Sequence, residues 1–475
     1  MAIDSERLDR TLIDAFNRNS FAGLGAGIVK DGQLIYARAF GLADASRKIP
    51  AATDTSFRIG SISKTFTAIA LMQLHEQGKF KLDDPVSGYL KAYKIEQPRT
   101  AAPITFRHLL THTSGLGELR RLTDLIRPTI GLARKPGKLQ SLAQYYAPAL
   151  KADVAPGVKW SYANHGFATL GQLVEDISGQ PFAEYMRQHV FAPLGMDRTD
   201  YVLSERVRDT LAVGYRMTRR GLNPIPYMEI AVGPAGSVFS SVEQMAKYVS
   251  ALLAGGANDH GRVLEPALLV MMLTPHYQLD PRLSAQGLAF MLGFIDGIRI
   301  AGHDGGWPGF TSAMWLAPER AVGAVVFTNT SALVAPDTLA LELIRQAVGV
   351  TGQTAGRPVV EQPTLWNELC GTYRPLRGFN SNFRLWGLGG ALRIFVRGGR
   401  LMIGGRHPFG PVRRGLELHA VDPADPLLFQ AELRAELGGL EIGVLFRRNS
   451  KGRVDSMDVT ASAGTFFSLH RRVRR

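Results

Sequence analysis

The chain has 475 residues, 45% of them hydrophobic and 20% charged, a composition typical of a soluble globular protein with two or three domains and not of a disordered one. Lys and Arg exceed Asp and Glu by 14, so the surface attracts anions, but no aromatic-interleaved basic motif accompanies the charge and we expect no nucleic-acid partner. The single cysteine, Cys370, excludes disulfide bonds within the chain.

The N-terminal residues do not resemble a leader peptide. Residues 1–8 lack the basic and apolar stretches of a secretory signal. Along the chain, no run of about 20 apolar residues could span a bilayer. We therefore expect a cytoplasmic protein without a membrane span, or a periplasmic one if a leader has been trimmed away.

The first 60 residues predict a helix followed by a β-hairpin. Helical periodicity covers residues 5–17, and two strand-like runs, 25–29 and 33–40, flank the turn Lys30-Asp31-Gly32. Residues 55–60 then predict a short extended run that ends in a flexible glycine.

The segment Ser61-Ile62-Ser63-Lys64 is the only Ser-x-x-Lys in the chain, and residues 65–77 after it predict a helix. Positions three apart share a helical face, so the Ser61 hydroxyl and the Lys64 amine would be neighbours. The hydroxyl becomes a strong nucleophile once a base takes its proton, and a lysine can do so only when it is neutral. The backbone N–H of Ser61, at the start of the helix, would point at an oxyanion formed on the substrate.

A second candidate segment is Tyr162-Ala163-Asn164, the only Tyr-x-Asn in the chain, which follows a Pro156-Gly157 turn. A phenol near a lysine ammonium loses its proton more readily and can serve as a general base. The amide of Asn164 could hold a substrate carbonyl.

A third candidate lies after a predicted strand at residues 298–301, in the stretch Gly302-His303-Asp304-Gly305-Gly306. His303 would point into a cleft. Gly305 and Gly306 would let a substrate approach the backbone closely, and the N–H of Gly306 would be a second oxyanion donor beside that of Ser61.

Each of these segments also has a plain structural interpretation. A Ser-x-x-Lys is often a helix cap beside a solvated lysine. A Tyr-x-Asn is often a half-buried tyrosine and a turn asparagine, and a glycine-rich stretch is often a turn with a surface histidine. No one of these segments identifies a protein family, but their order along the chain does.

In this order the three segments resemble the serine β-lactamase and penicillin-binding protein superfamily, in its class C β-lactamase, esterase and D-aminopeptidase branch, similar to peptidase S12 enzymes. The phrases Phe57–Ser61, Ile104–Leu116 and Pro156-Gly157 support the resemblance, which covers residues 5–350. It implies that Ser61 is the nucleophile and that Lys64 with Tyr162 transfers the proton.

The same resemblance makes Asn164 a substrate clamp and places His303 first in the third motif. Penicillin-recognising relatives usually carry Lys-Thr-Gly there, and this chain has no Lys-Thr-Gly. A histidine is a weaker anchor than lysine for the carboxylate of a β-lactam. His-x-Gly is similar to the esterases and D-aminopeptidases of the superfamily.

The pair His108 and His112 has the spacing of metal ligands on a helix, but the glutamate of a His-Glu-x-x-His site is missing. We interpret it as a helix C-terminus and a polar turn under the floor of the active site. Neither a metal nor another cofactor is expected.

The fold class predicted is α/β (α+β), with strands from both ends of residues 1–350 in one antiparallel sheet and a helical subdomain between them. Residues 351–364 form a linker. Residues 365–475 show short alternating runs typical of an all-β barrel, whose start at Leu369–Tyr373 resembles lipocalin-like barrels.

The function predicted is that of a serine hydrolase acting through an acyl-enzyme on a small peptide, amide or ester. A small peptide or amide is favoured, because the C-terminal domain suggests restricted access to the cleft. A β-lactamase or DD-carboxypeptidase is the alternative enzyme. A slowly acylated ligand sensor is the alternative of another class, and the sequence is compatible with a homo-oligomer.

Overall fold

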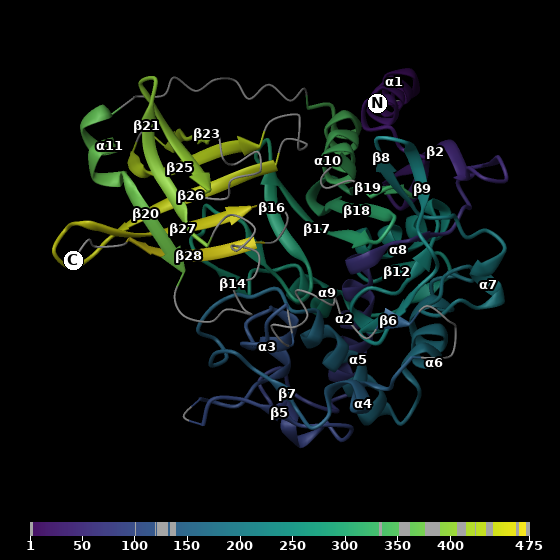
Figure 1. Cartoon of the computed structure of the whole chain (residues 1–475). Coiled ribbons are helices and arrows are strands. Elements are labelled where there is room, and N and C mark those ends of the chain that lie inside the picture. The colour runs from purple at the N-terminus through teal and green to yellow at the C-terminus, as the bar shows by residue number, and fades with distance from the viewer. Residues whose placement is uncertain are drawn as a thin grey trace.

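The structure, a computed structural model, describes residues 3–99, 101–118, 120, 132–133, 139–331, 335–350, 362–375, 390–405, 415–422, 424–433, 440–461 and 465–471. It contains two nine-stranded sheets, one in each half of the molecule. Figure 1 shows the C-terminal sheet beside the mixed helix and sheet part of the chain. Most of the predicted linker 351–364 lies outside the described residues, so the domain boundaries stay a prediction.

The first sheet is antiparallel throughout and has the order β14-β15-β16-β17-β18-β19-β1-β2-β3. Its strands are β1 (Gly23–Lys30), β2 (Gln33–Asp44), β3 (Ile49–Pro50), β14 (Tyr277–Gln278), β15 (Ala285–Gln286), β16 (Met291–Ile295), β17 (Ile298–Trp307), β18 (Phe310–Ala317) and β19 (Val322–Thr328). The pair β1–β19 joins segments near opposite ends of residues 1–350. The predicted antiparallel sheet is confirmed.

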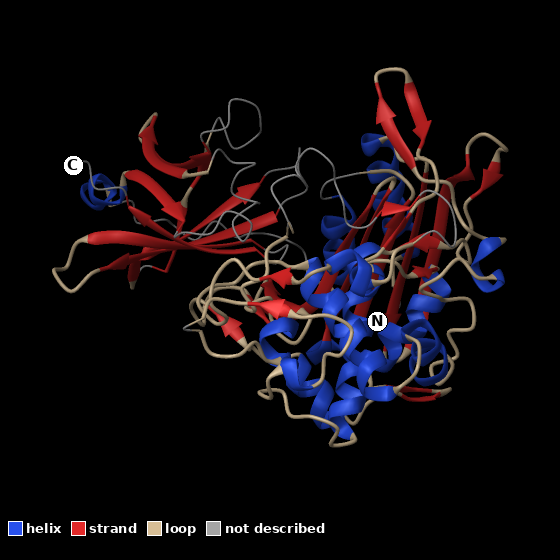
Figure 2. Ribbon diagram, turned by 60° about the horizontal axis from the view of Figure 1, so that its bottom comes forward, coloured by secondary structure: helices blue, strands red, loops and turns tan. Residues whose placement is uncertain are grey.

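Both faces of this sheet are buried, because side chains of alternate residues enter two different cores. In β19, Val325 and Phe327 pack on the side of α8 (Val242–Leu253), while Ala324 and Val326 pack on the side of α1 (Ser5–Asn19) and α10 (Ala335–Val348). Figure 2 shows the helices gathered around these strands. The sheet therefore forms the middle layer of an α/β/α sandwich.

The helical subdomain is built around α2 (Ser63–Glu76), whose residues Ser63–Leu74 are all buried. A helix that is buried on every side belongs to the centre of a domain. It packs against α5 (Asn164–Ser178), α6 (Phe182–Met186) and η4 (Arg187–Phe191). The other helices of this part of the chain are α3 (Phe106–Leu110), α4 (Leu142–Tyr146), α7 (Glu205–Arg208) and α9 (Pro266–Met272).

Short elements connect these helices to the sheet. They are β4 (Phe57–Arg58), η1 (Gly60–Ile62), η2 (Val86–Gly88), β5 (Ile95–Glu96), β6 (Leu132–Ala133), β7 (Leu150–Lys151), β8 (Tyr215–Thr218), β9 (Gly221–Pro224), β10 (Glu229–Ile230), η5 (Gly233–Ala235), β11 (Phe239–Ser240), β12 (Ala257–Asn258), β13 (Gly261–Arg262) and η6 (Pro318–Arg320). Within the described part of the chain, no helix has the length and apolar character needed to cross a membrane.

The C-terminal sheet is a nearly closed barrel with the order β23-β22-β21-β20-β28-β27-β26-β25-β24. It follows α11 (Pro363–Leu369) and consists of β20 (Gly371–Pro375), β21 (Leu392–Arg397), β22 (Arg400–Gly405), β23 (Leu416–Glu417), β24 (His419–Asp422), β25 (Asp425–Leu433), β26 (Leu440–Arg448), β27 (Val454–Ala461) and β28 (Thr465–Arg471). One apolar core fills its interior. The predicted all-β domain is confirmed.

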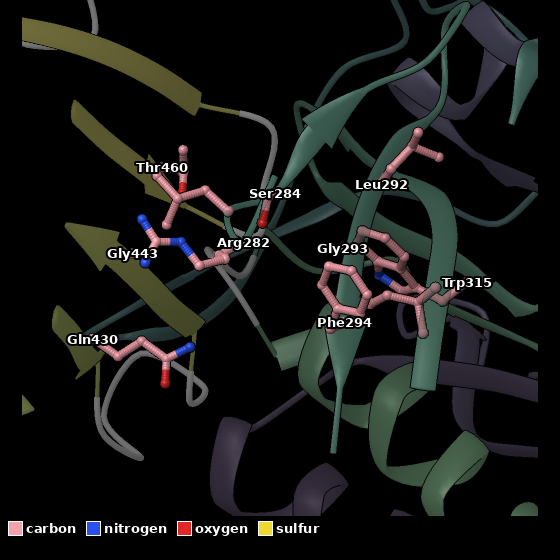
Figure 3. Close-up of a pocket in the computed structure, with 11 residues that line it drawn as sticks. Arg282, Ser284, Leu292, Gly293, Phe294, Trp315, Gln430, Gly443 and Thr460 are labelled. Atoms are coloured by element: carbon pink, nitrogen blue, oxygen red, sulfur yellow. The ribbon is translucent and has the colours of Figure 1, made fainter. Parts of the chain in front are cut away.

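The barrel docks on the segment from β14 to β15. Leu283 of this segment packs against Leu428 and Leu445 of the barrel. Arg447 donates a hydrogen bond to the carbonyl of Leu279 at 2.7 Å, and Arg282 forms an ion pair with Asp425 at 2.6 Å. A cavity of about 60 Å³ remains between the barrel and β16, and Figure 3 shows the residues that line it.

Candidate active site

Ser61 lies in η1, directly before α2, and the backbone around it is pressed against β17. Gly60 has a φ of +53°, in the left-handed region that favours glycine, and a Cβ there would come within 2.6 Å of the backbone N of Gly306. The N–H groups of Ser61 and Gly306 are therefore carried by two backbones that touch. The sequence predicts such a pair of donors for an oxyanion.

Lys64 is fully buried, and its Nζ lies within hydrogen-bond distance of three oxygen atoms. They are Oγ of Ser61 at 2.9 Å, Oδ1 of Asn164 at 2.8 Å and the carbonyl oxygen of Ala235 at 2.7 Å. An ammonium has three N–H donors and no lone pair, so these three acceptors match the protonated form of the amine. Four elements, α2, η1, α5 and η5, meet at this nitrogen.

Tyr162 is buried beside Lys64, whose Nζ lies 4.8 Å from the centre of the phenol ring. The ring of His112 stacks on it, with centroids 4.5 Å apart and an interplanar angle of 28°. The same histidine accepts N–H bonds from both neighbours of the tyrosine, at its carbonyl from Ser161 (2.7 Å) and at Nδ1 from Ala163 (3.1 Å). His112 thus fixes the position of Tyr162.

This arrangement gives the two predicted histidines separate structural roles. Helix α3 ends at Leu110, so His112 lies beyond it and has a left-handed φ of +59°, whereas His108 caps α3 together with Thr105. The two therefore do not share a helix face. No group of three His, Cys, Asp or Glu side chains that could hold a metal is found among the residues that the structure describes.

His303 lies in β17 and is buried, with 1% of its surface exposed. Its ring centroid is 6.2 Å from that of Tyr162, and its Nδ1 is 2.6 Å from the carbonyl oxygen of Asp304. A carbonyl only accepts hydrogen bonds, so Nδ1 carries the hydrogen. The ring of His303 thus packs next to Tyr162, and the expectation that it points into the cleft and contacts substrate stays a prediction.

The two glycines of the third motif differ in their surroundings. A Cβ at Gly305 would overlap the carbonyl of Ile59 and Oγ of Ser312, whereas a Cβ at Gly306 would meet nothing within 4 Å. Gly305 therefore lets β17 approach the strand that leads to Ser61. Gly306 is exposed and has open space on its side-chain side.

The sequence analysis did not identify Arg58, a buried cation three residues before Ser61. Its guanidinium lies 4.0 Å from the ring centre of Trp307 and 4.2 Å from that of Phe239, and it donates a hydrogen bond to the carbonyl of Met228 at 2.7 Å. Burial lowers the pKa of Arg58 to about 10, so it stays charged at neutral pH. The only signal in the sequence was a charged residue inside an otherwise apolar run.

A cavity of about 340 Å³ lies next to η5. Its polar lining includes Arg58, Glu175, Tyr227, Glu229 and Ser237. The polar lining residues come from segments that are far apart in the sequence, which is why the sequence analysis did not find it.

The fold has a clear counterpart among solved structures. A solved structure, an octameric penicillin-binding protein homologue from Pyrococcus abyssi, superposes with a TM-score of 0.64 at 23% identity and covers 98% of this chain and 100% of its own. This similarity shows the β-lactamase and penicillin-binding protein fold.

Curated relatives agree with this fold. An esterase from Burkholderia gladioli is 30% identical over 70% of this chain and 93% of its own length. A D-aminopeptidase from Brucella anthropi is 26% identical over 76% of this chain and 66% of its own length. Among the relatives compared, the matched share of the relative runs from 54% to 93%.

The family profile described as Beta-lactamase matches residues 8–349, which contain every candidate residue of the site. Relatives named as a D-aminopeptidase and an esterase match 76% and 70% of this chain. The chain therefore belongs to the Beta-lactamase family and is a serine hydrolase of that family.

Proposed function

We propose that the protein hydrolyses a small peptide or amide through an acyl-enzyme formed on Ser61. The observation that supports this most directly is the Lys64 amine, buried and 2.9 Å from Oγ of Ser61. A buried ammonium at this place favours negative charge on the serine oxygen, which is what a nucleophile needs.

The three oxygen atoms around Lys64 support one choice of base. The three oxygen atoms match the three N–H donors of an ammonium, so in this mechanism Lys64 is charged and has no lone pair for Ser61. We therefore assign the base to Tyr162, whose phenolate form the nearby ammonium favours. Lys64 acts as a fixed positive charge between serine and phenol.

In acylation the Ser61 proton moves to the Tyr162 phenolate as Oγ bonds to the substrate carbonyl carbon. The N–H groups of Ser61 and Gly306 hold the oxyanion. Tyr162 then gives its proton to the amine as the C–N bond breaks. In deacylation a water loses its proton to Tyr162 and attacks the acyl carbon, and Ser61 recovers the proton as it leaves.

Two observations favour a small amide over a β-lactam. His303 is buried and engaged with a backbone carbonyl, so the third motif offers no exposed cation for a substrate carboxylate. Strand β28 of the barrel reaches Trp160, two residues before Tyr162, so the barrel bounds the site on that side. A bounded site suits short substrates.

The test is a steady-state survey with D- and L-amino-acid p-nitroanilides, p-nitrophenyl esters and nitrocefin. We expect multiple turnovers, with a higher kcat/KM for at least one p-nitroanilide than for nitrocefin. A higher kcat/KM for nitrocefin would support a β-lactamase instead. A single stoichiometric burst without turnover for every compound would identify a sensor, not an enzyme.

A further inference from the structure

We propose that Phe466, in the C-terminal barrel, is a positioning residue for Tyr162, so that the barrel is part of the catalytic machinery without touching substrate. The proposal rests on the proposed function of Tyr162 as the base. It links the two halves of the molecule at one aromatic contact.

The side chain of Phe466 packs outside the apolar core of the barrel. It is 2% exposed and packs within the same apolar cluster as Trp160 and Tyr162. Its neighbour Phe467 packs against the internal core of the barrel. Successive side chains of a strand point to opposite faces, so β28 presents one phenylalanine to each half of the molecule.

The rings of Phe466 and Trp160 make an edge-to-face contact, with centroids 5.1 Å apart and an interplanar angle of 64°. Tyr277 of β14 closes the same cluster, with its ring 5.7 Å from Phe466 at 85°. Burial raises the pKa of Tyr277 to about 12, and a hydrogen bond with the Trp160 backbone partly offsets this rise. Trp160 is thus held at its ring by the barrel and at its backbone by β14.

Packing is what sets the orientation of the Trp160 ring. Its indole Nε1 is buried and has no hydrogen-bond partner within the described part of the chain. A buried ring without a polar anchor takes the rotamer that its neighbours impose, and protein interiors leave few gaps for it to move. Phe466 is one of those neighbours.

The orientation of the Trp160 ring affects the position of Tyr162, because the two rings pack close together and both contact His112. The Trp160 ring lies 5.6 Å from that of His112 and 6.2 Å from that of Tyr162. His112 in turn stacks on Tyr162 and bonds to the backbone on both sides of it. A shift of Trp160 into a space vacated by Phe466 would therefore move the phenol oxygen relative to Lys64 and Ser61.

Contacts near Phe466 hold the barrel against the first sheet. Arg447 and Leu445 of β26 dock on the β14–β15 segment through the carbonyl of Leu279 and the side chain of Leu283. Tyr277, at the start of this segment, is the residue that contacts both Phe466 and Trp160. The segment on which the barrel docks therefore also contains the residue that contacts Trp160.

The experiment compares Phe466→Ala with Phe467→Ala, which removes the same ring from the next position of the strand. The probe is p-nitrophenyl acetate, and the rate of acylation is followed by p-nitrophenol release in single turnovers. We expect F466A to lower the acylation rate by about 10- to 100-fold with little change in KM, as a misplaced catalytic group does. F467A should keep a rate close to that of the wild type.

A double-mutant cycle separates positioning from general damage. In a Tyr162→Phe background there is no phenol oxygen to position, so adding F466A should cause little further loss. Phe466→Leu, which refills most of the space, should recover part of the rate. Thermal unfolding checks that each variant is folded, and the cycle is run with F466L if F466A is not.

The outcomes distinguish this proposal from the proposed function. If Tyr162→Phe alone keeps the wild-type rate, the assignment of the base is wrong. If Tyr162→Phe is impaired but F466A lowers its rate by the same factor as in the wild type, the base assignment stands and the positioning role is refuted. Equal rates for F466A and F467A would also refute it.

Discussion

Lys64 is the residue on which the chemistry of the site depends. Burying the ammonium of a lysine costs free energy unless polar partners replace the water around it. Here three oxygen atoms from three elements replace that water. In the proposed mechanism the amine is therefore a fixed charge, and the phenol beside it transfers the proton. Two predictions follow from these roles.

Lys64→Ala and Tyr162→Phe should each lower kcat on the order of 10²–10⁴-fold, the usual contribution of a group that moves or stabilises a proton. Because the two act as one unit, the double variant should be little slower than the slower single variant. Steady-state kinetics with one p-nitroanilide measures all four forms. Losses that simply multiply would show that the two residues act independently.

His303→Lys tests the argument from the third motif. A lysine at this position would bring a positive charge to the floor beside Tyr162, which should favour substrates that carry a carboxylate. We expect the ratio of nitrocefin acylation to p-nitrophenyl ester acylation to rise. His303→Gln, which retains a donor for the Asp304 carbonyl without the charge, is the control, and an unchanged ratio in the lysine variant would locate the discrimination elsewhere.

At the level of elements, the site depends on how closely β17 approaches η1. The sequence predicts a strand only at residues 298–301, whereas β17 runs to Trp307. Glycines at 302, 305 and 306 indicate a turn when they are taken locally. In the structure β17 pairs with β16 and β18, and this pairing outweighs the local preference.

We therefore expect opposite effects on stability when Gly305 and Gly306 of β17 are replaced by alanine. Gly305→Ala places a methyl group on the carbonyl of Ile59 and should destabilise the protein by about 1–3 kcal/mol, with loss of activity. Gly306→Ala points into open space and should change stability by less than about 0.5 kcal/mol. Denaturant unfolding measures both, and equal stability of the two variants would contradict the packing described for β17.

Other elements could be predicted from the sequence because their signals are local. The helix predicted at residues 65–77 is observed at Ser63–Glu76, and the strand predicted at 400–403 is observed at Arg400–Gly405. Partners brought in by the fold could not be predicted. The carbonyl of Ala235 lies 171 residues from Lys64, and no sequence pattern marks it.

At the scale of the whole molecule, the barrel and the catalytic half meet at a polar rim as well as at Phe466. Asp280 accepts hydrogen bonds from Arg282, and Arg447 of the barrel lies 3.8 Å from the same carboxylate. The bonds from Arg282 lower the pKa of Asp280 below its usual range. A lowered pKa means that the charged form stabilises the folded state.

The lowered pKa of Asp280 predicts how its contribution to stability depends on pH. The contribution of Asp280 is present above the ordinary pKa of an aspartate, about 4, and is lost as the pH falls below it. Asp280→Asn should therefore lower the melting temperature by about 1–3 °C at pH 7.

The difference should shrink as the pH falls towards 3. Glu319→Gln, which removes an exposed ion pair with Arg299, is the control and should change little at any pH. A difference between Asp280→Asn and the wild type that is the same at pH 7 and pH 3 would show that the charge of Asp280 is not what holds the rim.

The most direct test of the account is to trap the acyl-enzyme and locate it. The protein is mixed with a p-nitrophenyl ester, quenched in acid within the first turnover, weighed by intact-mass spectrometry and mapped by peptide fragmentation. The account predicts a mass increase equal to one acyl group, located on Ser61 and absent from Ser61→Ala, which should not turn over. An acyl group on another residue, or a Ser61→Ala variant that hydrolyses at the wild-type rate, would contradict it.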